Sequence, residues 1–275
     1  MSHSFSIRES TLGKLFPERL LWTLCIHVDK GKEVWVVAGM LVQYLESATD
    51  SVIVRDDKEN PIGVIGGKEI MVNLLENPTS SLFYETKVED IMELNPITVS
   101  KDTKYEDLMK KWKERGRAYA IVANEWGFYS AISAQKILEI GKKCKTNLTI
   151  EDLPKKEIVT FKKRDTFDSV INSMFDNKSR KILLENSTKY LSDRLIIETI
   201  TEKMKHLKET DNFLDKSVEN VELEEAKVIN KNLKINEVSD IMYDMAHPFV
   251  MYKDWLVTPW DICNVMLSPD VTIDK

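Results

Sequence analysis

Two polar residues near the C-terminus, Thr258 and Asp261, are spaced so that both would lie at the start of one helix. Thr258 suits the N-cap, Pro259 suits the first helical position, and Asp261 then falls at the third. Apolar residues 256–257 predict a strand that ends at this corner. A nucleotide could place its ribose hydroxyls on the Asp261 carboxylate and a phosphate at the helix end. The alternative is a variant capping box with no ligand.

The same strand-to-helix corner recurs along the chain at a period of about 60 to 70 residues. It begins at Gly66, Ser133 and Ser192, and for the fourth time at Thr258. Each corner closes a predicted βαββα unit, so we expect an α/β (α+β) protein of four such units. One unit alone would expose an apolar sheet face, which pairing two units would bury. The expected modules are residues 17–141 (units of about 17–77 and 88–141) and residues 147–268 (units of about 147–205 and 217–268).

The hydrophobic pattern assigns secondary structure within these units. In the first unit it predicts a strand at residues 34–37 and a helix at residues 40–45. An amphipathic helix in the second unit is predicted to end at Gly116. The polar residues 1–15 are expected to be loosely ordered, and the apolar-rich residues 18–28 fit a helix or a strand equally well.

Composition narrows the classes of protein that fit. The chain has 275 residues and a net charge of −6, which argues against a general nucleic-acid binder. No apolar run approaches the ~20 residues that span a bilayer, and residues 1–4 show no signal-peptide pattern. Cys25, Cys144 and Cys263 lack metal-ligand spacing, as expected for reduced thiols. We therefore expect a cytoplasmic protein with no membrane partner and no metal site.

The second and fourth units carry motifs of a known family. The segments VEDIM, PITV, AIV and AIS, which start at residues 88, 96, 120 and 131, follow the family run V-x-D-I-M … P-x-T-V … P-V-V-D … G-I-I-T-x-x-D. The closing V-T-x-x-D stands intact at residues 257–261, whereas residues 63–65 and 191–192 match more weakly. Over residues 17–267 the chain therefore resembles the cystathionine β-synthase (CBS) domain family.

The resemblance implies that CBS motifs pair into Bateman modules with clefts between the two motifs. Such modules commonly bind adenine nucleotides or S-adenosylmethionine and regulate something else. Four motifs in one chain are similar to the architecture of the AMP-activated protein kinase γ subunit and of stand-alone CBS proteins from bacteria and archaea.

The acidic position that closes the family motif differs among the four units. In chain order it is Glu69, Lys136, Leu195 and Asp261. A carboxylate accepts hydrogen bonds from two vicinal hydroxyls, which lysine and leucine cannot do. Glu69 keeps the carboxylate but follows two glycines, which lack the hydroxyl. Only the fourth unit retains the whole constellation, so the second module is predicted to hold the ligand.

Other binding residues are candidates through the resemblance. His247 stands where the family often places a basic residue facing nucleotide phosphates, although a lone histidine is more often structural. Arg180 and Lys181 precede the matching strand of the third unit and could bind phosphate, or could be solvated surface charges. Thr160 lies at a strand entrance where backbone groups would meet the adenine edge.

A weaker second site is expected in the first module. Its candidate residues are Arg117, Ser133 and Lys136, which could bind a phosphate but not a ribose in the usual way. The cleft would either hold such an anion or be empty.

No catalytic motif stands out in the sequence. The four histidines lie far apart, and there is no Walker loop, His-Glu-x-x-His, Gly-x-Ser-x-Gly or Cys-x-x-Cys. We therefore expect a non-catalytic sensor that binds AMP, ADP, ATP or S-adenosylmethionine, requires no cofactor, and signals occupancy to a regulated protein. The alternative is a degenerate CBS scaffold with empty clefts. Either would be a monomer or a homodimer.

Overall fold

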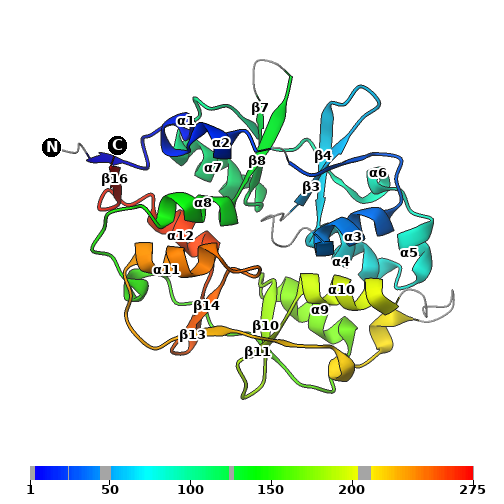
Figure 1. Cartoon of the computed structure of the whole chain (residues 1–275). Coiled ribbons are helices and arrows are strands. Elements are labelled where there is room, and N and C mark those ends of the chain that lie inside the picture. Colours follow the sequence, from blue (N-terminus) through cyan, green and yellow to red (C-terminus); the bar gives the residue numbers. More distant parts are fainter. Residues whose placement is uncertain (1–3, 24, 44–50, 124–126, 204–211, 275) are drawn as a thin grey trace. The chain divides into compact units, whose positions relative to one another are not determined.

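The computed structural model describes residues 4–23, 25–43, 51–123, 127–203 and 212–274 (Figure 1). The chain forms two compact units, each assembled from distant segments. Unit 1 comprises Met1–Cys25, Pro96–Glu157 and Lys227–Lys275, and unit 2 comprises Ile26–Asn95 and Ile158–Ala226. Unit 1 thus contains the second and fourth repeats, and unit 2 the first and third. Each of the modules expected at residues 17–141 and 147–268 would combine one repeat of unit 1 with one repeat of unit 2. The pairing of repeats within these modules stays a prediction.

Each repeat of unit 1 contains a three-stranded sheet, in which a parallel strand is followed by an antiparallel hairpin. The sheet orders are β6-β7-β8 and β13-β14-β15. The second repeat consists of β6 (Thr98–Val99), α7 (Tyr105–Arg115), β7 (Tyr119–Ala123), β8 (Tyr129–Ser133) and α8 (Ala134–Gly141). The fourth consists of β13 (Lys227–Ile229), α11 (Ile235–Tyr243), β14 (Val250–Tyr252), β15 (Trp255–Val257) and α12 (Pro259–Val265).

Unit 2 repeats this order, with one additional strand on each sheet. The sheet orders are β2-β3-β4-β5 and β12-β11-β10-β9. The first repeat consists of β2 (His27–Asp29), α3 (Val34–Gln43), β3 (Ser51–Arg55), β4 (Pro61–Gly66) and α4 (Gly67–Glu76), followed by α5 (Ser80–Tyr84), α6 (Val88–Ile91) and β5 (Glu93–Leu94). The third consists of β9 (Thr160–Phe161), α9 (Phe167–Asp176), β10 (Lys181–Leu184), β11 (Lys189–Ser192) and α10 (Asp193–Lys203), followed by η4 (Phe213–Asp215), η5 (Val218–Asn220) and β12 (Glu224–Glu225).

The predicted α/β class and the fourfold βαββα order are confirmed, and so is the end of α7 at Gly116. This glycine has φ +66°, a left-handed conformation that glycine adopts without a Cβ penalty.

The expectation of a loosely ordered N-terminal segment is wrong. β1 (Ser4–Ser6) pairs antiparallel with β16 (Thr272–Asp274), and α1 (Leu12–Leu15) and α2 (Glu18–Leu21) follow it. Ile7 and Leu12 are fully buried in unit 1. The few apolar side chains of this polar segment are therefore enough to anchor it, because a hydrophobic core is available to receive them.

The strand expected at residues 34–37 is also wrong, because these residues begin helix α3. Val34, Val37, Ala38 and Leu41 are buried, while Trp35 is 45% exposed. This spacing of three and four residues is the helical period. A run of four apolar residues does not by itself distinguish a helix from a strand, and the tertiary contacts decide.

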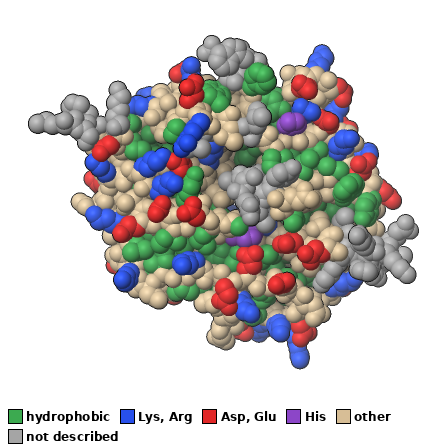
Figure 2. Space-filling view, viewed as in Figure 1, with side chains coloured by type: hydrophobic (Ala, Val, Ile, Leu, Met, Phe, Trp, Pro, Cys, Tyr) green, Lys and Arg blue, Asp and Glu red, His purple; other side chains and the backbone are tan. Residues whose placement is uncertain are grey.

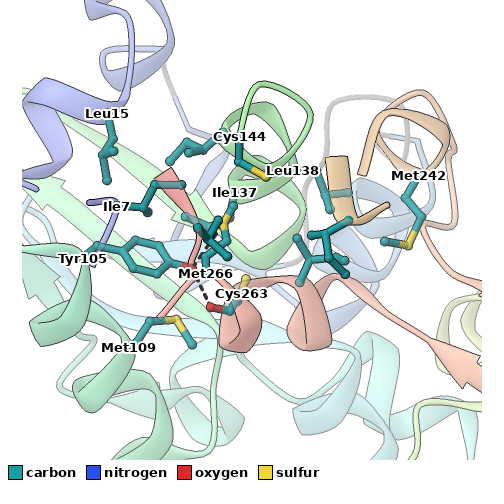
Figure 3. Close-up of a cluster of buried hydrophobic side chains, with 14 of the residues drawn as sticks. Ile7, Leu15, Tyr105, Met109, Ile137, Leu138, Cys144, Met242, Cys263 and Met266 are labelled. Atoms are coloured by element: carbon teal, nitrogen blue, oxygen red, sulfur yellow. Dashed lines mark hydrogen bonds between the residues drawn. The ribbon is translucent and has the colours of Figure 1, made fainter. Parts of the chain in front are cut away.

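One helix organises the core of unit 1. α8 packs against both helices of the fourth repeat, α11 and α12. Figure 3 shows the side chains around it, among them Ile137, Leu138, Met242 and Met266. The buried Tyr105 hydroxyl donates a 2.9 Å hydrogen bond to the Cys263 carbonyl. This core holds the start of α8 and the start of α12 in one compact unit.

Candidate functional site

The strand-to-helix corner of the fourth repeat is an ordered polar site. β15 ends at Val257, Thr258 is the extended N-cap residue, and α12 starts at Pro259. The Asp261 carboxylate turns back to this corner, where its Oδ2 accepts the Thr258 N–H at 2.8 Å and the Thr258 hydroxyl at 2.7 Å. Asp261 is only 3% exposed. The capping interaction predicted from the sequence is therefore present, and it fixes the carboxylate at the helix mouth.

The second oxygen of this carboxylate carries an ion pair that the sequence did not predict. Lys156 Nζ lies 2.6 Å from Asp261 Oδ1. The two partners differ in burial, since the side chain of Lys156 is 47% exposed and the side chain of Asp261 is only 4% exposed. The buried charge is thus neutralised by a cation that remains in contact with water.

Lys156 belongs to residues 148–157, a segment that we call the strap. It crosses the fourth repeat with contacts along its length. The Ile150 N–H donates to the Leu233 carbonyl, and the Tyr252 hydroxyl donates to Glu151 at 2.9 Å. Near its end, Lys155 Nζ lies 4.8 Å from the centroid of the Trp255 ring, and Glu157 forms a β-bridge with Trp255. The available sequence signal was a pair of lysines next to Pro154, near the start of the second predicted module.

The corner of the second repeat has the same backbone form and the opposite charge. The Ser133 hydroxyl accepts the Lys136 N–H at 3.3 Å, so this corner is capped by its own side chain. Lys136 Nζ donates to the Ala131 carbonyl at 3.0 Å. Burial lowers the pKa of Lys136 to about 8, because desolvation disfavours the ammonium form. Arg117, the third predicted member of this site, also lies in unit 1, two residues before the start of β7.

The two corners of unit 2 are built differently. At the first, Glu69 is buried and its Oε2 accepts the Gly66 N–H at 2.8 Å. At the third, Ser192 caps the Leu195 N–H, and Leu195 itself is a buried apolar residue. A carboxylate therefore stands at the corner in the first and fourth repeats.

Arg180, a predicted phosphate ligand, is held by an internal carboxylate. Its Nε and Nη2 lie 2.8 Å and 2.7 Å from Asp193 Oδ2, at the start of α10. Asp193 was not identified from the sequence, although an acidic residue in the first turn of a helix is a recognisable signal. Lys181 opens β10 opposite Ser192, and Thr160 is exposed at the start of β9.

The structure thus groups the predicted ligand residues by unit. Thr258, Asp261 and the buried His247 lie in the fourth repeat in unit 1, whereas Thr160, Arg180 and Lys181 lie in the third repeat in unit 2. A single site that combines all six residues stays a prediction.

The cysteines are in surroundings that suppress thiol reactivity. Burial raises the pKa of Cys25 to about 11 and that of Cys144 to about 11, and it also raises the pKa of Cys263. Among the described residues, no group of three or more His, Cys, Asp or Glu side chains is arranged to hold a metal ion.

Acidic and basic side chains are interspersed over the face shown in Figure 2. Within the ranges that the structure covers, no helix has both the length and the apolarity that crossing a bilayer would require.

No protein-family model matches the sequence, and no curated protein matches it either. Solved structures do match. Protein MJ1225 from Methanocaldococcus jannaschii, described as a candidate archaeal homologue of γ-AMPK, superposes with a TM-score of 0.74 at 15% identity, over 93% of this chain and 99% of that chain. An uncharacterised conserved protein from Pyrococcus horikoshii gives a TM-score of 0.52 at 12% identity, over 79% and 91%. The CBS-domain containing protein ATU1752 from Agrobacterium tumefaciens gives 0.42 at 15% identity, over 50% and 96%.

Proposed function

The chain has the fold of a CBS-domain protein with four repeats, and on this premise we propose that it is a regulatory sensor of an adenosine-containing ligand. AMP, ADP, ATP and S-adenosylmethionine are the candidate ligands, bound through the corner of the fourth repeat. The neighbour that covers 93% of this chain is described as a candidate archaeal homologue of γ-AMPK, and this description supports a regulatory role. The protein would act without catalysis, as a monomer or homodimer, on a partner protein.

The observation that carries the proposal is the state of the Asp261 carboxylate. It is buried, oriented by two hydrogen bonds from Thr258, and its Oδ1 faces a side chain that is half exposed. Two vicinal ribose hydroxyls need an acceptor of fixed orientation and full charge, and hydrogen bonds to a charged group are the stronger kind. The corresponding residues of the second and third repeats, Lys136 and Leu195, offer no such acceptor.

His247 and the third-repeat residues belong to the proposal as secondary ligands. A phosphate that approached Arg180 would have to share or replace its pairing with Asp193. The second proposed site, formed by Ser133, Lys136 and Arg117, would accept an anion because Lys136 brings a half-buried positive charge to the start of α8.

One observation favours the alternative function, a scaffold without ligand. Asp261 is satisfied internally by Thr258 and Lys156, so the corner is stable as it stands. In that case the repeats would serve only to present surfaces to another protein or to a second copy of this chain.

Calorimetric titration of the full chain with AMP, ADP, ATP and S-adenosylmethionine separates the two functions. Asp261→Asn removes the charge and keeps the side-chain shape, so the affinity for the bound ligand should fall by about 1.5–3 kcal/mol, roughly 10- to 150-fold. Asp240→Asn, at an exposed position of α11 in the same repeat, is the matched control and should bind as wild type does. Equal affinities of wild type and Asp261→Asn would remove Asp261 from the site, and absence of binding by wild type would favour the scaffold.

A further inference from the structure

We propose that Lys156 is an internal competitor for the ligand at Asp261, and that ligand binding releases the strap that carries it. This inference rests on the proposed function, since it assumes that hydroxyl groups bind this carboxylate. It adds a residue that sets affinity and a route by which occupancy changes the structure.

The competition follows from the acceptor sites of the carboxylate. Thr258 occupies Oδ2 with two donors, its N–H and its hydroxyl. Lys156 occupies Oδ1 at 2.6 Å. A carboxylate has about four acceptor sites, two on each oxygen. With Oδ2 filled by Thr258 and one site of Oδ1 filled by Lys156, only one site is left, so two vicinal hydroxyls can both bind Oδ1 only after the ammonium has left it.

The burial of the two partners determines which one moves. Asp261 is fixed by Thr258 and enclosed by the core around α8 and α12. The Lys156 ammonium is half exposed at the end of a flexible four-carbon stem, so it can return to water with little loss. The ligand hydroxyls would then replace the lysine as donors to the buried charge.

The release would propagate along the strap because Lys156 is one of three attachments near its end. The others are the Lys155 contact with the Trp255 ring and the Glu157 bridge to Trp255. The earlier attachments, at Ile150 and Glu151, are independent of Asp261. Loss of the ion pair should therefore loosen residues 154–157 and leave residues 148–152 in place.

The position of the loosened segment in the chain makes it a suitable reporter of ligand binding at Asp261. Glu157 is the last residue of its segment of unit 1, and the chain enters unit 2 at Ile158. A change of order at residues 154–157 is thus a change at one of the covalent connections between the units.

The test uses the full chain, with AMP, ADP, ATP and S-adenosylmethionine as probes in parallel. Lys156→Met keeps the length of the side chain and removes the ammonium, so the affinity for the probe that binds wild type should rise about 2- to 5-fold, the size of a partly exposed ion pair. Lys113→Met is the matched control, because it removes the same charge at an exposed position of α7 in the same unit, and its affinity should equal that of wild type. Lys156→Arg keeps a cation and should bind as weakly as wild type or more weakly.

Hydrogen exchange measured on the same proteins reports the strap. In wild type the probe should accelerate amide exchange at residues 155–157 and leave residues 148–152 unchanged. In Lys156→Met exchange at residues 155–157 should be fast already, and the probe should add nothing.

The outcomes distinguish failure of this inference from failure of the proposed function. If a probe binds wild type but Lys156→Met gains no affinity, or if the strap exchanges equally with and without the probe, the competition is wrong and the sensor function stands. If no probe binds wild type, the ligand site and the competition at Asp261 both fall.

Discussion

The second and fourth repeats place residues of opposite charge at the same point of the fold. In each, a strand ends at a hydroxyl residue, a helix follows, and the third helical residue turns back to the corner. In the fourth repeat this residue is Asp261, which accepts the N–H of Thr258 and pairs with Lys156. In the second it is Lys136, which donates to the Ala131 carbonyl. The backbone makes the corner in both cases, and one side chain decides whether it would attract hydroxyls and cations or anions.

In unit 2 a charged side chain is accommodated at a strand-to-helix corner in a second way. Gly67 begins α4 so close to Asp193 that a Cβ at this position would come well inside 3.0 Å of the Asp193 carboxylate. Here a glycine makes room for an acidic side chain from another repeat, and Arg180 neutralises that side chain. At the fourth corner, in unit 1, the charged residue Asp261 comes from the repeat itself and its counterion Lys156 comes from the strap.

A charge reversal at the fourth corner should give the largest effect on stability. Asp261→Lys gives this corner the same third helical residue as the second repeat. The substitution removes the acceptor for Thr258 and places the new ammonium next to that of Lys156. We expect a loss of about 3–4 kcal/mol in the free energy of unfolding, measured by denaturant titration. Asp270→Lys makes the same charge change at an exposed position of unit 1 and should cost no more than about 0.5 kcal/mol. A small effect of Asp261→Lys would mean that the corner tolerates either charge.

A methyl group at Gly67 tests the close approach of this residue to the Asp193 carboxylate. Gly67→Ala should displace the Asp193 carboxylate and disturb its pairing with Arg180, for a loss of about 1–3 kcal/mol of stability. Gly39→Ala is the control, because Gly39 lies in α3 of the same unit and, outside that helix's own backbone, a Cβ there meets no atom of the described residues within 4 Å. It should be neutral or stabilising by up to about 1 kcal/mol, the helix-propensity difference. Equal melting temperatures for the two variants would contradict the close approach.

Removal of the charge at the second corner should have the smallest effect, and its sign should be opposite to that at the fourth. Lys136→Met removes a half-buried ammonium whose pKa is lowered to about 8, so we expect a gain of about 1–2 kcal/mol at pH 7. In the unfolded chain the Lys136 ammonium has the ordinary lysine pKa of about 10.4. Between about pH 8 and pH 10 the unfolded chain therefore binds more protons than the folded chain.

The stability of wild type should consequently rise with pH across this window, by up to about 1.4 kcal/mol per pH unit, relative to Lys136→Met. Denaturant titrations of the two proteins at pH 7, 8, 9 and 10 measure the difference. A constant difference over this range would show that Lys136 is not desolvated.

The sequence by itself determined what depends on neighbouring residues. The four corners, the capping role of Thr258 and Asp261, the end of α7 at Gly116 and the different closing residues of the repeats were all predictable. Caps, turns and the identity of the third helical residue act over three or four positions. The fold class was predictable from the order of strands and helices for the same reason, because each repeat shows its own hydrophobic period.

Only the tertiary structure decided which distant residues meet. The helical state of residues 34–37 and the order of the N-terminal segment depend on burial that no local pattern reveals. The pairing of Lys156 with Asp261 depends on the path of the strap over the fourth repeat, and that of Arg180 with Asp193 depends on the register of the β10–β11 hairpin. A short hydrophobic run fits a helix or a strand, and a lysine in a linker fits many surfaces, until packing selects among them. The counterions that control the candidate site therefore emerged from the fold, whereas the site's carboxylate was already evident in the sequence.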